Sequence, residues 1–368
     1  MAKSPLHELS EHGQSVWIDF LSRNMLRTGE LERMMRDDAV VGVTSNPTIF
    51  QKAISAGDAY DDQLREVLQH ERDPKEIFVH LASKDVGDAL DLLRGVWDEG
   101  GGRDGYVSIE VDPNLAYDTE ATIAEAQRLH ELIDRPNLFV KIPATQAGLP
   151  AIEEMIARGK SINVTLIFSL QRYAEVAEAY IRGLERLVEG GGDPSRVTSV
   201  ASFFVSRVDT EADKRLDAIS GHDHLKGRLA IANAKLAYQR YKEIFAGERW
   251  ERLAARGAST QRCLWASTST KNPAYRDVMY VEELIGPKTV NTMPRETIEA
   301  FQDHGEVRET LEQGLDEARQ LLVELAEAGV DYDDVTRVLE EEGVEKFADS
   351  FDELIEGLRA KKEQLVAA

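Results

Sequence analysis

The chain has 368 residues, 42% hydrophobic and 30% charged, and this composition is typical of a soluble globular protein with a large core. Its 44 Lys and Arg residues stand against 67 Asp and Glu residues, and the net charge of −23 at pH 7 disfavours nucleic acid and anionic membranes as partners, because their phosphates need a basic surface. The single cysteine excludes an internal disulfide, and we expect a cytoplasmic protein because the sequence shows neither a signal-like apolar region nor a membrane-length apolar run.

Short apolar runs rich in β-branched residues recur along the chain, and each predicts a buried strand. In chain order they are residues 15–20, 39–46, 105–113, 137–145, 161–169, 198–207, 262–268 and 288–294. The segments between them have the three- and four-residue apolar spacing of helices. The connections 51–104 and 208–261 are long enough for more than one helix each.

This alternation of strand and helix predicts parallel strands joined by right-handed crossovers. Eight such units predict an α/β fold, a closed (β/α)8 TIM barrel that forms a single domain over residues 1–368. The alternative is an open doubly wound sheet, which is disfavoured because no G-x-G-x-x-G motif follows the first strand. Residues 306–368 are predicted to be a helical tail packed on the barrel, since apolar residues such as Phe347 and Phe351 recur at helical spacing.

Polar residues recur near the carboxyl end of every predicted strand. A single buried polar residue is usually a satisfied core group, but polar residues at the same end of all eight strands fit the active-site face of a barrel better. The set consists of Asp19, Thr44, Asn46, Ser108, Glu110, Asp112, Lys141, Asn163, Thr165, Ser202, Ser206, Ser267 and Asn291.

Lys141 stands in the apolar segment "LFVKIPAT", residues 138–145. Burial among apolar side chains favours the neutral amine, which attacks a carbonyl and forms a Schiff base. The resulting iminium is an electron sink that allows a C–C bond two atoms away to break. The alternative is a strand-end lysine whose amine extends to solvent. The nucleophile is favoured because neighbouring strands supply groups for acid–base chemistry and for an ordered water, namely Asp19, Glu110 and Thr165.

Six segments together resemble transaldolase, and they follow one another along nearly the whole chain. They are "GVTSNPTIF" (42–50), "VSIEVDP" (107–113), "LFVKIPAT" (138–145), "INVTLIFS" (162–169), "ASFFVSRVD" (201–209) and "WASTSTKNP" (265–273). The resemblance implies a class I aldolase-like (β/α)8 barrel without a cofactor. It also implies transfer of a dihydroxyacetone unit from sedoheptulose 7-phosphate or fructose 6-phosphate to glyceraldehyde 3-phosphate or erythrose 4-phosphate, in the pentose phosphate pathway.

The resemblance assigns the chemistry to four residues. Lys141 resembles the Schiff-base lysine, and Asp19 resembles the acid–base group that takes the proton of the C4 hydroxyl during cleavage. Glu110 and Thr165 resemble the pair that positions the catalytic water.

The resemblance also implies contacts with substrate. Asn46 and Asn163 resemble the asparagines that hold substrate hydroxyls or the intermediate. Ser202 resembles a substrate contact, Arg207 a phosphate clamp, and Phe204 the aromatic wall between them.

The segment after strand seven departs from the better-known members of the family. Those members carry Ser-x-Arg, with both residues on the phosphate, whereas this chain reads "ASTSTKN" and has Lys271 where the arginine is expected. Ser267 and Ser269 both remain candidates for the partner serine. Lysine brings a point charge without the bidentate fork of arginine. The same residues resemble a subgroup in which transaldolase can be fused to glucose-6-phosphate isomerase, and we expect no such second domain here because 368 residues are too few for it.

Three other functions stay as alternatives. Fructose 6-phosphate aldolases resemble the family but are shorter and carry Gln and Tyr at the positions of Glu110 and Phe204. A non-catalytic barrel acting as a binding subunit is disfavoured by the intact set of Lys141, Asp19 and Glu110. A metal-dependent aldolase is disfavoured because no strand-end histidine cluster is visible, so we expect no metal and no cofactor. The expected partners are small sugar phosphates. Oligomeric state stays open, with a homodimer as one option.

Overall fold

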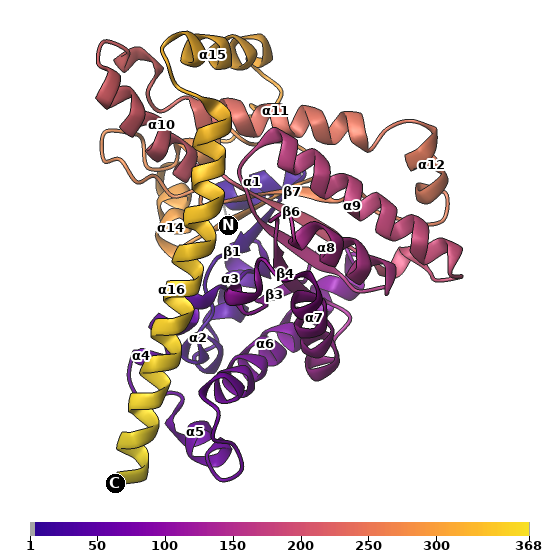
Figure 1. The fold of residues 1–368 in the computed structure, drawn as a ribbon, viewed down its shortest axis with the longest axis vertical. Helices are drawn as coiled ribbons and strands as arrows, with labels where there is room; N and C mark the ends of the chain where they lie inside the picture. Colours follow the sequence, from indigo (N-terminus) through magenta and orange to yellow (C-terminus); the bar gives the residue numbers. More distant parts are fainter. Residues whose placement is uncertain (1–3, 368) are drawn as a thin grey trace.

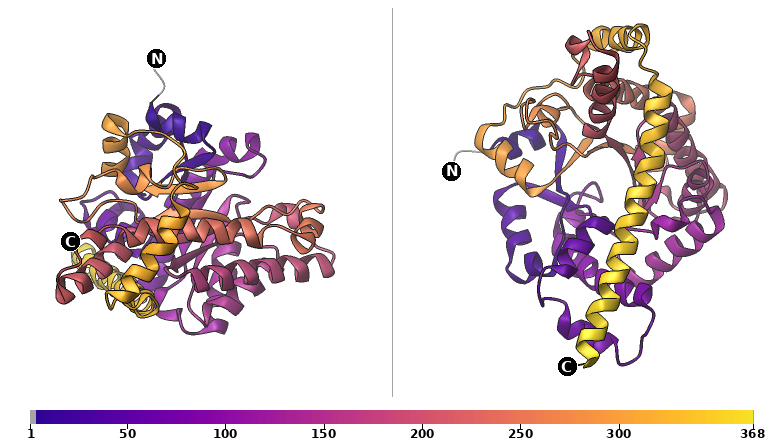
Figure 2. Two further views of the ribbon diagram at one scale, coloured as in Figure 1. Left: turned by 90° about the horizontal axis from the view of Figure 1, so that it is seen from above. Right: turned by 60° about the vertical axis from the view of Figure 1, so that its left-hand side comes forward.

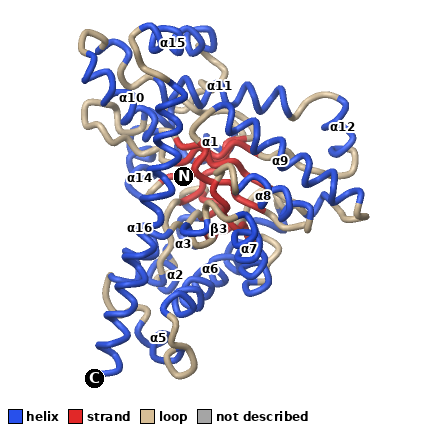
Figure 3. The backbone as a smooth tube through the Cα atoms, in the orientation of Figure 1, coloured by secondary structure: helices blue, strands red, loops and turns tan. Residues whose placement is uncertain are grey.

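The computed structural model describes residues 4–367 and has a closed barrel of eight parallel strands at its centre (Figures 1 and 3). The strands follow one another around the barrel in chain order, and β8 pairs with β1. Seven of the eight predicted runs contain a whole strand, and β1 begins one residue before its run, so the (β/α)8 barrel is confirmed. The strands are β1 Gln14–Ile18, β2 Val40–Val43, β3 Val107–Glu110, β4 Leu138–Pro143, β5 Ile162–Ile167, β6 Ser199–Phe204, β7 Arg262–Ala266 and β8 Thr289–Met293.

Helices surround the strands on all sides in Figure 3. Both long connections contain more than one helix, as expected from their length. Within residues 4–367, none of the helices combines the length and the apolar character that crossing a membrane requires. The α-helices are α1 Pro5–Glu11, α2 Arg23–Arg27, α3 Glu30–Asp37, α4 Pro47–Ser55, α5 Asp61–Val67, α6 Pro74–Glu99, α7 Thr119–Ile133, α8 Gly148–Ala157, α9 Leu170–Glu189, α10 Ser206–Ile219, α11 Leu229–Ile244, α12 Glu248–Ala254, α13 Met279–Glu282, α14 Arg295–His304, α15 Leu315–Glu327 and α16 Tyr332–Ala367, with short 3₁₀ helices η1 Pro113–Leu115, η2 Pro194–Arg196 and η3 Asp223–Leu225.

The amino end of the barrel is closed by a buried polar network. Asp104 forms an ion pair of 3.0 Å with Arg262 of β7 and accepts hydrogen bonds from Trp17 Nε1 and Ser15 Oγ of β1. Trp17 fits against β2 because Gly42 has no side chain; a Cβ there would lie 2.5 Å from the indole. In TIM barrels this end serves stability, which leaves the opposite end for chemistry.

The strand register sets the positions of the central polar residues. Glu110 of β3 pairs with Lys141 of β4, and Lys141 pairs with Asn163 of β5. Laterally paired residues in neighbouring strands point to the same side of a sheet. The three side chains therefore point into the barrel together.

Two backbone irregularities lie at the carboxyl end of the barrel. Leu166 in β5 has φ of 59°, and the pairing of β5 with β6 shifts register between Val164 and Ile167. Ser267, directly after β7, has φ of 56°. Non-glycine residues in the left-handed region cost free energy and concentrate at functional sites. Here they redirect the chain just beyond Thr165 and at the start of the loop that carries Lys271.

The chain ends with α15 and α16, while residues 305–314 between α14 and α15 contain no helix. Helix α16 runs the length of the molecule beside the barrel, in yellow in Figures 1 and 2. It contacts α4, α6, α10, η1 and β5. Residues far apart in the sequence thus meet near the carboxyl end of the barrel.

Candidate active site

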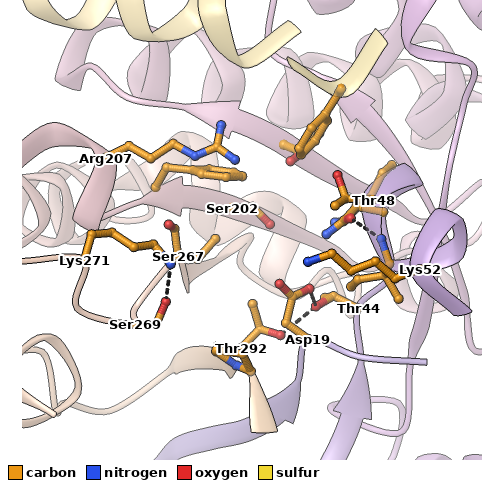
Figure 4. Close-up of a pocket in the computed structure, with 18 of the residues that line it drawn as sticks. Asp19, Thr44, Thr48, Lys52, Ser202, Arg207, Ser267, Ser269, Lys271 and Thr292 are labelled. Atoms are coloured by element: carbon orange, nitrogen blue, oxygen red, sulfur yellow. Dashed lines mark hydrogen bonds between the residues drawn. The ribbon is translucent and has the colours of Figure 1, made fainter. Parts of the chain in front are cut away.

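A pocket of about 300 Å³ opens at the carboxyl end of the barrel (Figure 4). Ten of the twelve residues selected from the sequence line it, and they come from six of the eight strands or from the loops that follow them. These ten are Asp19, Asn46, Lys141, Thr165, Ser202, Phe204, Arg207, Ser267, Ser269 and Lys271.

Lys141 is the buried amine of this pocket, with 5% of its surface exposed. Its Nζ donates a hydrogen bond of 3.0 Å to the backbone carbonyl of Ser45, just after β2. The side chain of Ser45 is itself fixed, since its Oγ donates to the carbonyl of Ser108 at 2.7 Å. The amine is therefore held by a backbone acceptor, in a position where it can reach a carbonyl group in the pocket.

Asp19 lies directly after β1, and its backbone N–H bonds to the carbonyl of Met293 at 2.8 Å. Its Oδ1 accepts a hydrogen bond of 2.6 Å from Thr44 Oγ1, which also lies 2.6 Å from Thr292 Oγ1. Asp19 and both threonines line the pocket, as Figure 4 shows. The hydroxyl network fixes the carboxylate in the pocket that Lys141 also lines.

Glu110 does not line the main pocket. It borders a small adjoining cavity, together with Asn46 and Phe351, and its Oε2 is buried without a hydrogen-bond partner in the described chain. Burial raises the pKa of Glu110 to about 7, and the nearby Asp19 acts in the same direction, while Lys141 acts against it. A carboxyl group with such a pKa takes up and releases protons near neutrality.

Thr165 lines the pocket from β5, and its Oγ1 is fully buried with no hydrogen-bond partner in the described chain. Buried polar atoms are nearly always satisfied by protein, water or ligand. The free oxygens of Thr165 and Glu110 are therefore two places at which a bound water or a substrate oxygen would gain hydrogen bonds.

Asn163 is paired with Lys141 in the barrel but does not line the pocket. Its Nδ2 donates to Ser108 Oγ at 3.0 Å, and its Oδ1 accepts from Ser202 Oγ at 2.7 Å. Both ends of the amide are thus used within the barrel, where they orient Ser202, which does line the pocket. A direct contact of Asn163 with substrate stays a prediction.

Asn46 has a structural task in addition to its place in the pocket. It is the N-cap of α4, with Pro47 in the first turn, and its Oδ1 accepts a hydrogen bond of 3.0 Å from Ile49 N. Asparagine before proline is a favoured helix start. The amide end left for a ligand is Nδ2, a donor.

Arg207 and Lys271 bring positive charge to one side of the pocket. The guanidinium of Arg207, in the first turn of α10, lies 5.1 Å from the centre of the Phe204 ring, and its Nη1 is buried without a partner in the described chain. Burial lowers the pKa of Arg207. Partial burial in the pocket also lowers the pKa of Lys271, and the charge of Arg207 adds to that effect.

The two candidate serines of the β7 loop have different surroundings. Ser267 Oγ lies 2.9 Å from Ser206 Oγ at the start of α10, whereas Ser269 Oγ accepts a hydrogen bond of 2.5 Å from Lys271. The loop is tied to α10 by Tyr275, whose hydroxyl donates to Asp213 at 2.5 Å. The longer loop of this chain thus holds Ser269 and Lys271 as a pair on the pocket side.

Several lining residues had not been selected from the sequence. Lys52 lies one helical turn after Thr48, so this i, i+4 spacing was the signal that places both on the same face of α4. The side chain of Lys52 has no ion-pair or hydrogen-bond partner among residues 4–367, and Figure 4 places it across the pocket from Arg207. Thr44 had been noted only among the polar strand ends, and the residues not selected at all are Thr48, Ile49, Lys52, Ala266, Thr292, Pro294, Glu296 and Phe347.

Among the described residues, no group of three or more His, Cys, Asp and Glu side chains is arranged to hold a metal ion. The absence of a metal or cofactor requirement stays a prediction, and its test is activity after chelation.

Comparison with known proteins gives consistent matches over nearly the whole chain. The family model described as "Transaldolase/Fructose-6-phosphate aldolase" matches residues 16–358. A protein named "Transaldolase" from Frankia alni is 55% identical over 355 residues, 96% of each chain. A "Transaldolase" from Acidothermus cellulolyticus is 56% identical over 352 residues, 95% of each chain. A "Transaldolase 2" from Streptomyces coelicolor is 51% identical over 364 residues, 98% of each chain.

The buried Glu110 generates a prediction about stability. Its pKa is raised from 4.5 to about 7 in the folded chain, so the unfolded chain loses this proton first and stability falls as pH rises between those values. Glu110→Gln removes that fall. The difference in free energy of unfolding between the variant and wild type should therefore shift in favour of the variant by on the order of 3 kcal/mol from pH 4 to pH 8. Chemical denaturation at both pH values measures the difference. An exposed control, Glu345→Gln, should show no comparable trend; equal trends in both variants would contradict the prediction.

Proposed function

Because the chain belongs to the transaldolase/fructose-6-phosphate aldolase family, we propose how its pocket carries out the reaction. Transaldolase activity, a transferase activity, follows from this membership and from relatives of 50–56% identity that carry the name. The observation that carries the proposed mechanism is the amine of Lys141, buried at the carboxyl end of the barrel. The following roles of individual residues are our proposal.

The reaction begins when Lys141 Nζ attacks the C2 carbonyl of a ketose phosphate and water leaves, giving an iminium. Asp19 then takes the proton of the C4 hydroxyl, the C3–C4 bond breaks, and its electron pair moves to the iminium, giving an enamine. The aldose phosphate formed from C4 onward departs. In the return direction C3 of the enamine attacks the aldehyde carbon of an acceptor, Asp19 gives its proton to the new hydroxyl, and hydrolysis frees the ketose product.

Water leaves the carbinolamine, the adduct that precedes the iminium, and water adds to the iminium again when the product is hydrolysed from the lysine. Glu110 and Thr165 are proposed to hold this water, since their oxygens Oε2 and Oγ1 have no hydrogen-bond partner in the described chain. A pKa of about 7 lets Glu110 accept a proton in one step and return it in the next. Asn46 Nδ2 and Ser202 Oγ are proposed to bind substrate hydroxyls, with Ser202 held in place by Asn163.

The phosphate is proposed to bind between Arg207 and Lys271. Ser269, which already accepts a hydrogen bond from Lys271, completes the site, and Ser267 supports the start of the loop through Ser206. Lys52 supplies a third cation on the opposite side of the pocket. Donor and acceptor sugars differ in chain length, so their phosphates lie at different distances from Lys141. Arg207 and Lys271 on one side and Lys52 on the other can bind phosphates at these different distances.

We further propose a single domain over residues 1–368, with residues 306–368 as a helical tail on the barrel, and a cytoplasmic location. The proposed substrates are the phosphates of fructose, sedoheptulose, glyceraldehyde and erythrose, without nucleic acid, membrane or cofactor. The contacts of α16 with α4, α6, α10 and β5 support the single domain.

The covalent intermediate is directly testable. Borohydride added with fructose 6-phosphate should fix a three-carbon adduct on Lys141, located by peptide mass spectrometry, and Lys141→Met should lose at least about 10²-fold in kcat. Lys52 and Lys271 are internal controls, because both are lysines of the same pocket and neither should be labelled. An adduct on either of them, or an active Lys141→Met variant, would contradict the mechanism.

The phosphate site predicts a selective loss of affinity. Charge-assisted contacts contribute about 1.5–3 kcal/mol, so Lys271→Met should raise KM for fructose 6-phosphate about tenfold or more and change turnover of free fructose much less. Lys52→Met should change KM by different factors when sedoheptulose 7-phosphate and when fructose 6-phosphate is the donor. Lys346→Met is the charge-matched control, because Lys346 lies on α16, pairs with Glu342 and does not line the pocket. Equal losses for phosphorylated and free sugars would make Lys271 structural.

Transfer and simple aldol cleavage differ in the fate of the bound three-carbon unit. Phe204 has no hydroxyl that activates water beside it, so wild type should form little glyceraldehyde 3-phosphate from fructose 6-phosphate until erythrose 4-phosphate is added. Phe204→Tyr adds a donor and an acceptor, and in combination with Glu110→Gln it should increase acceptor-independent release. The assay is product formation with and without acceptor. Rapid turnover of wild type without acceptor would identify an aldolase instead.

A further inference from the structure

The guanidinium of Arg207 is held by two aromatic rings from distant parts of the chain. Phe204 of β6 lies 5.1 Å from it and Phe347 of α16 lies 5.7 Å from it, ring centre to Cζ. Both rings are buried, with 7% and 5% of their surfaces exposed, and both line the pocket. The face of an aromatic ring attracts a guanidinium within about 6 Å. Arg207 is thus held between two rings, and the second ring belongs to the C-terminal helix.

Carboxylates do not hold Arg207. It forms no ion pair within residues 4–367, and its Nη1 is buried without a hydrogen-bond partner there. The acidic groups that affect it, Asp19, Glu110 and Glu342, act only over longer distances. An arginine loses much rotamer freedom when it is fixed, so the rings keep the guanidinium in place while its N–H groups stay available to a ligand.

Helix α16 is itself fixed on both sides of Phe347. Ser350 Oγ accepts a hydrogen bond of 2.8 Å from Thr48 Oγ1 in α4, and Phe351 packs edge-on against Phe78 at 5.6 Å. One turn before Phe347, Gly343 lies so close to the barrel that an added Cβ would be 3.1 Å from Leu166. The position of the Phe347 ring is therefore set by the barrel and by α4.

We infer that Phe347 is a positioning residue for the phosphate site, and that the C-terminal helix is thereby a working part of the pocket. The inference rests on the proposed function, in which Arg207 binds the substrate phosphate. Phe347 acts through Arg207: its ring fixes the plane of the guanidinium so that the unpartnered N–H groups face the phosphate. A ring that only filled space would affect stability and all substrates alike.

Two variants of the full-length protein test this inference. Phe347→Met keeps an apolar side chain of similar size without the aromatic face, and Phe347→Tyr keeps that face. With erythrose 4-phosphate saturating, Phe347→Met should raise KM for fructose 6-phosphate about fivefold and change kcat less than about twofold. The inhibition constant of inorganic phosphate should rise by a similar factor. Phe347→Tyr should restore both values, and reaction with free fructose should change little.

A double-mutant comparison shows whether the effect passes through Arg207. In an Arg207→Gln background the change Phe347→Met should alter KM less than about twofold, because the two residues act as one unit. Leu358→Ala is the matched packing control: Leu358 is buried on the same helix, with 1% of its surface exposed, and lies outside the pocket. This control should lower the melting temperature and leave KM unchanged.

The possible outcomes separate this inference from the proposed function. A wild type without transferase activity would overturn the proposed function. An active wild type whose KM is unchanged in Phe347→Met, or is changed equally in the Arg207→Gln background or in Leu358→Ala, would overturn only the role of Phe347. If Phe347→Met does not fold, Phe347→Tyr and Phe347→Leu replace it. A fivefold higher KM in Phe347→Tyr would overturn the inference. Unchanged kinetics in Phe347→Tyr together with a raised KM in Phe347→Leu would support it.

Discussion

The structure depends on the burial of one amine. Lys141 sits in a strand of a closed barrel with 5% of its surface exposed, where an ammonium ion is costly unless polar groups face it. Its hydrogen bond is to a backbone carbonyl, and the carboxyl group beside it, Glu110, is itself raised in pKa by burial. The two residues are paired in neighbouring strands and share one desolvated space. The proposed nucleophile and the carboxyl group proposed to hold water are therefore placed by the same burial.

The rest of the pocket has to place positive charge inside an acidic protein. A chain with net charge −23 has to bind a dianionic phosphate. Arg207, Lys271 and Lys52 meet around one cavity, and none of them is neutralised by an ion pair with a carboxylate in the described chain. Most of the other arginines and lysines form ion pairs on the surface, where such pairs contribute little to stability. The cations of the pocket are thus kept available for a ligand.

Arg207 is held by aromatic rings, and the loop that carries Lys271 is held by a tyrosine hydrogen bond, so neither cation is paired with a carboxylate among the described residues. The rings of Phe204 and Phe347 hold Arg207 without neutralising it, and the bond between Tyr275 and Asp213 ties the Lys271 loop to α10, which carries Arg207. This arrangement makes the replacement of arginine by Lys271 understandable. The longer loop carries a point charge and a serine as a pair, in place of a single bidentate side chain.

The sequence by itself determined the barrel and most of the pocket. Apolar runs at regular intervals predict eight parallel strands whatever the details of packing. Polar residues near the carboxyl ends of these runs, such as Asp19 and Thr165, must come to one edge of the barrel, and Lys141 stood out as a lysine inside an apolar run. Only the tertiary structure showed that Asn163 does not line the pocket and that Ser108 and Ser202 satisfy both ends of its amide. It alone also decided that Lys52 and Phe347 reach the pocket. The apolar stripe of α16 predicts that Phe347 is buried, but periodicity does not identify the residues that cover it. Those residues are set by contacts between α16 and parts of the barrel that lie far away in the sequence.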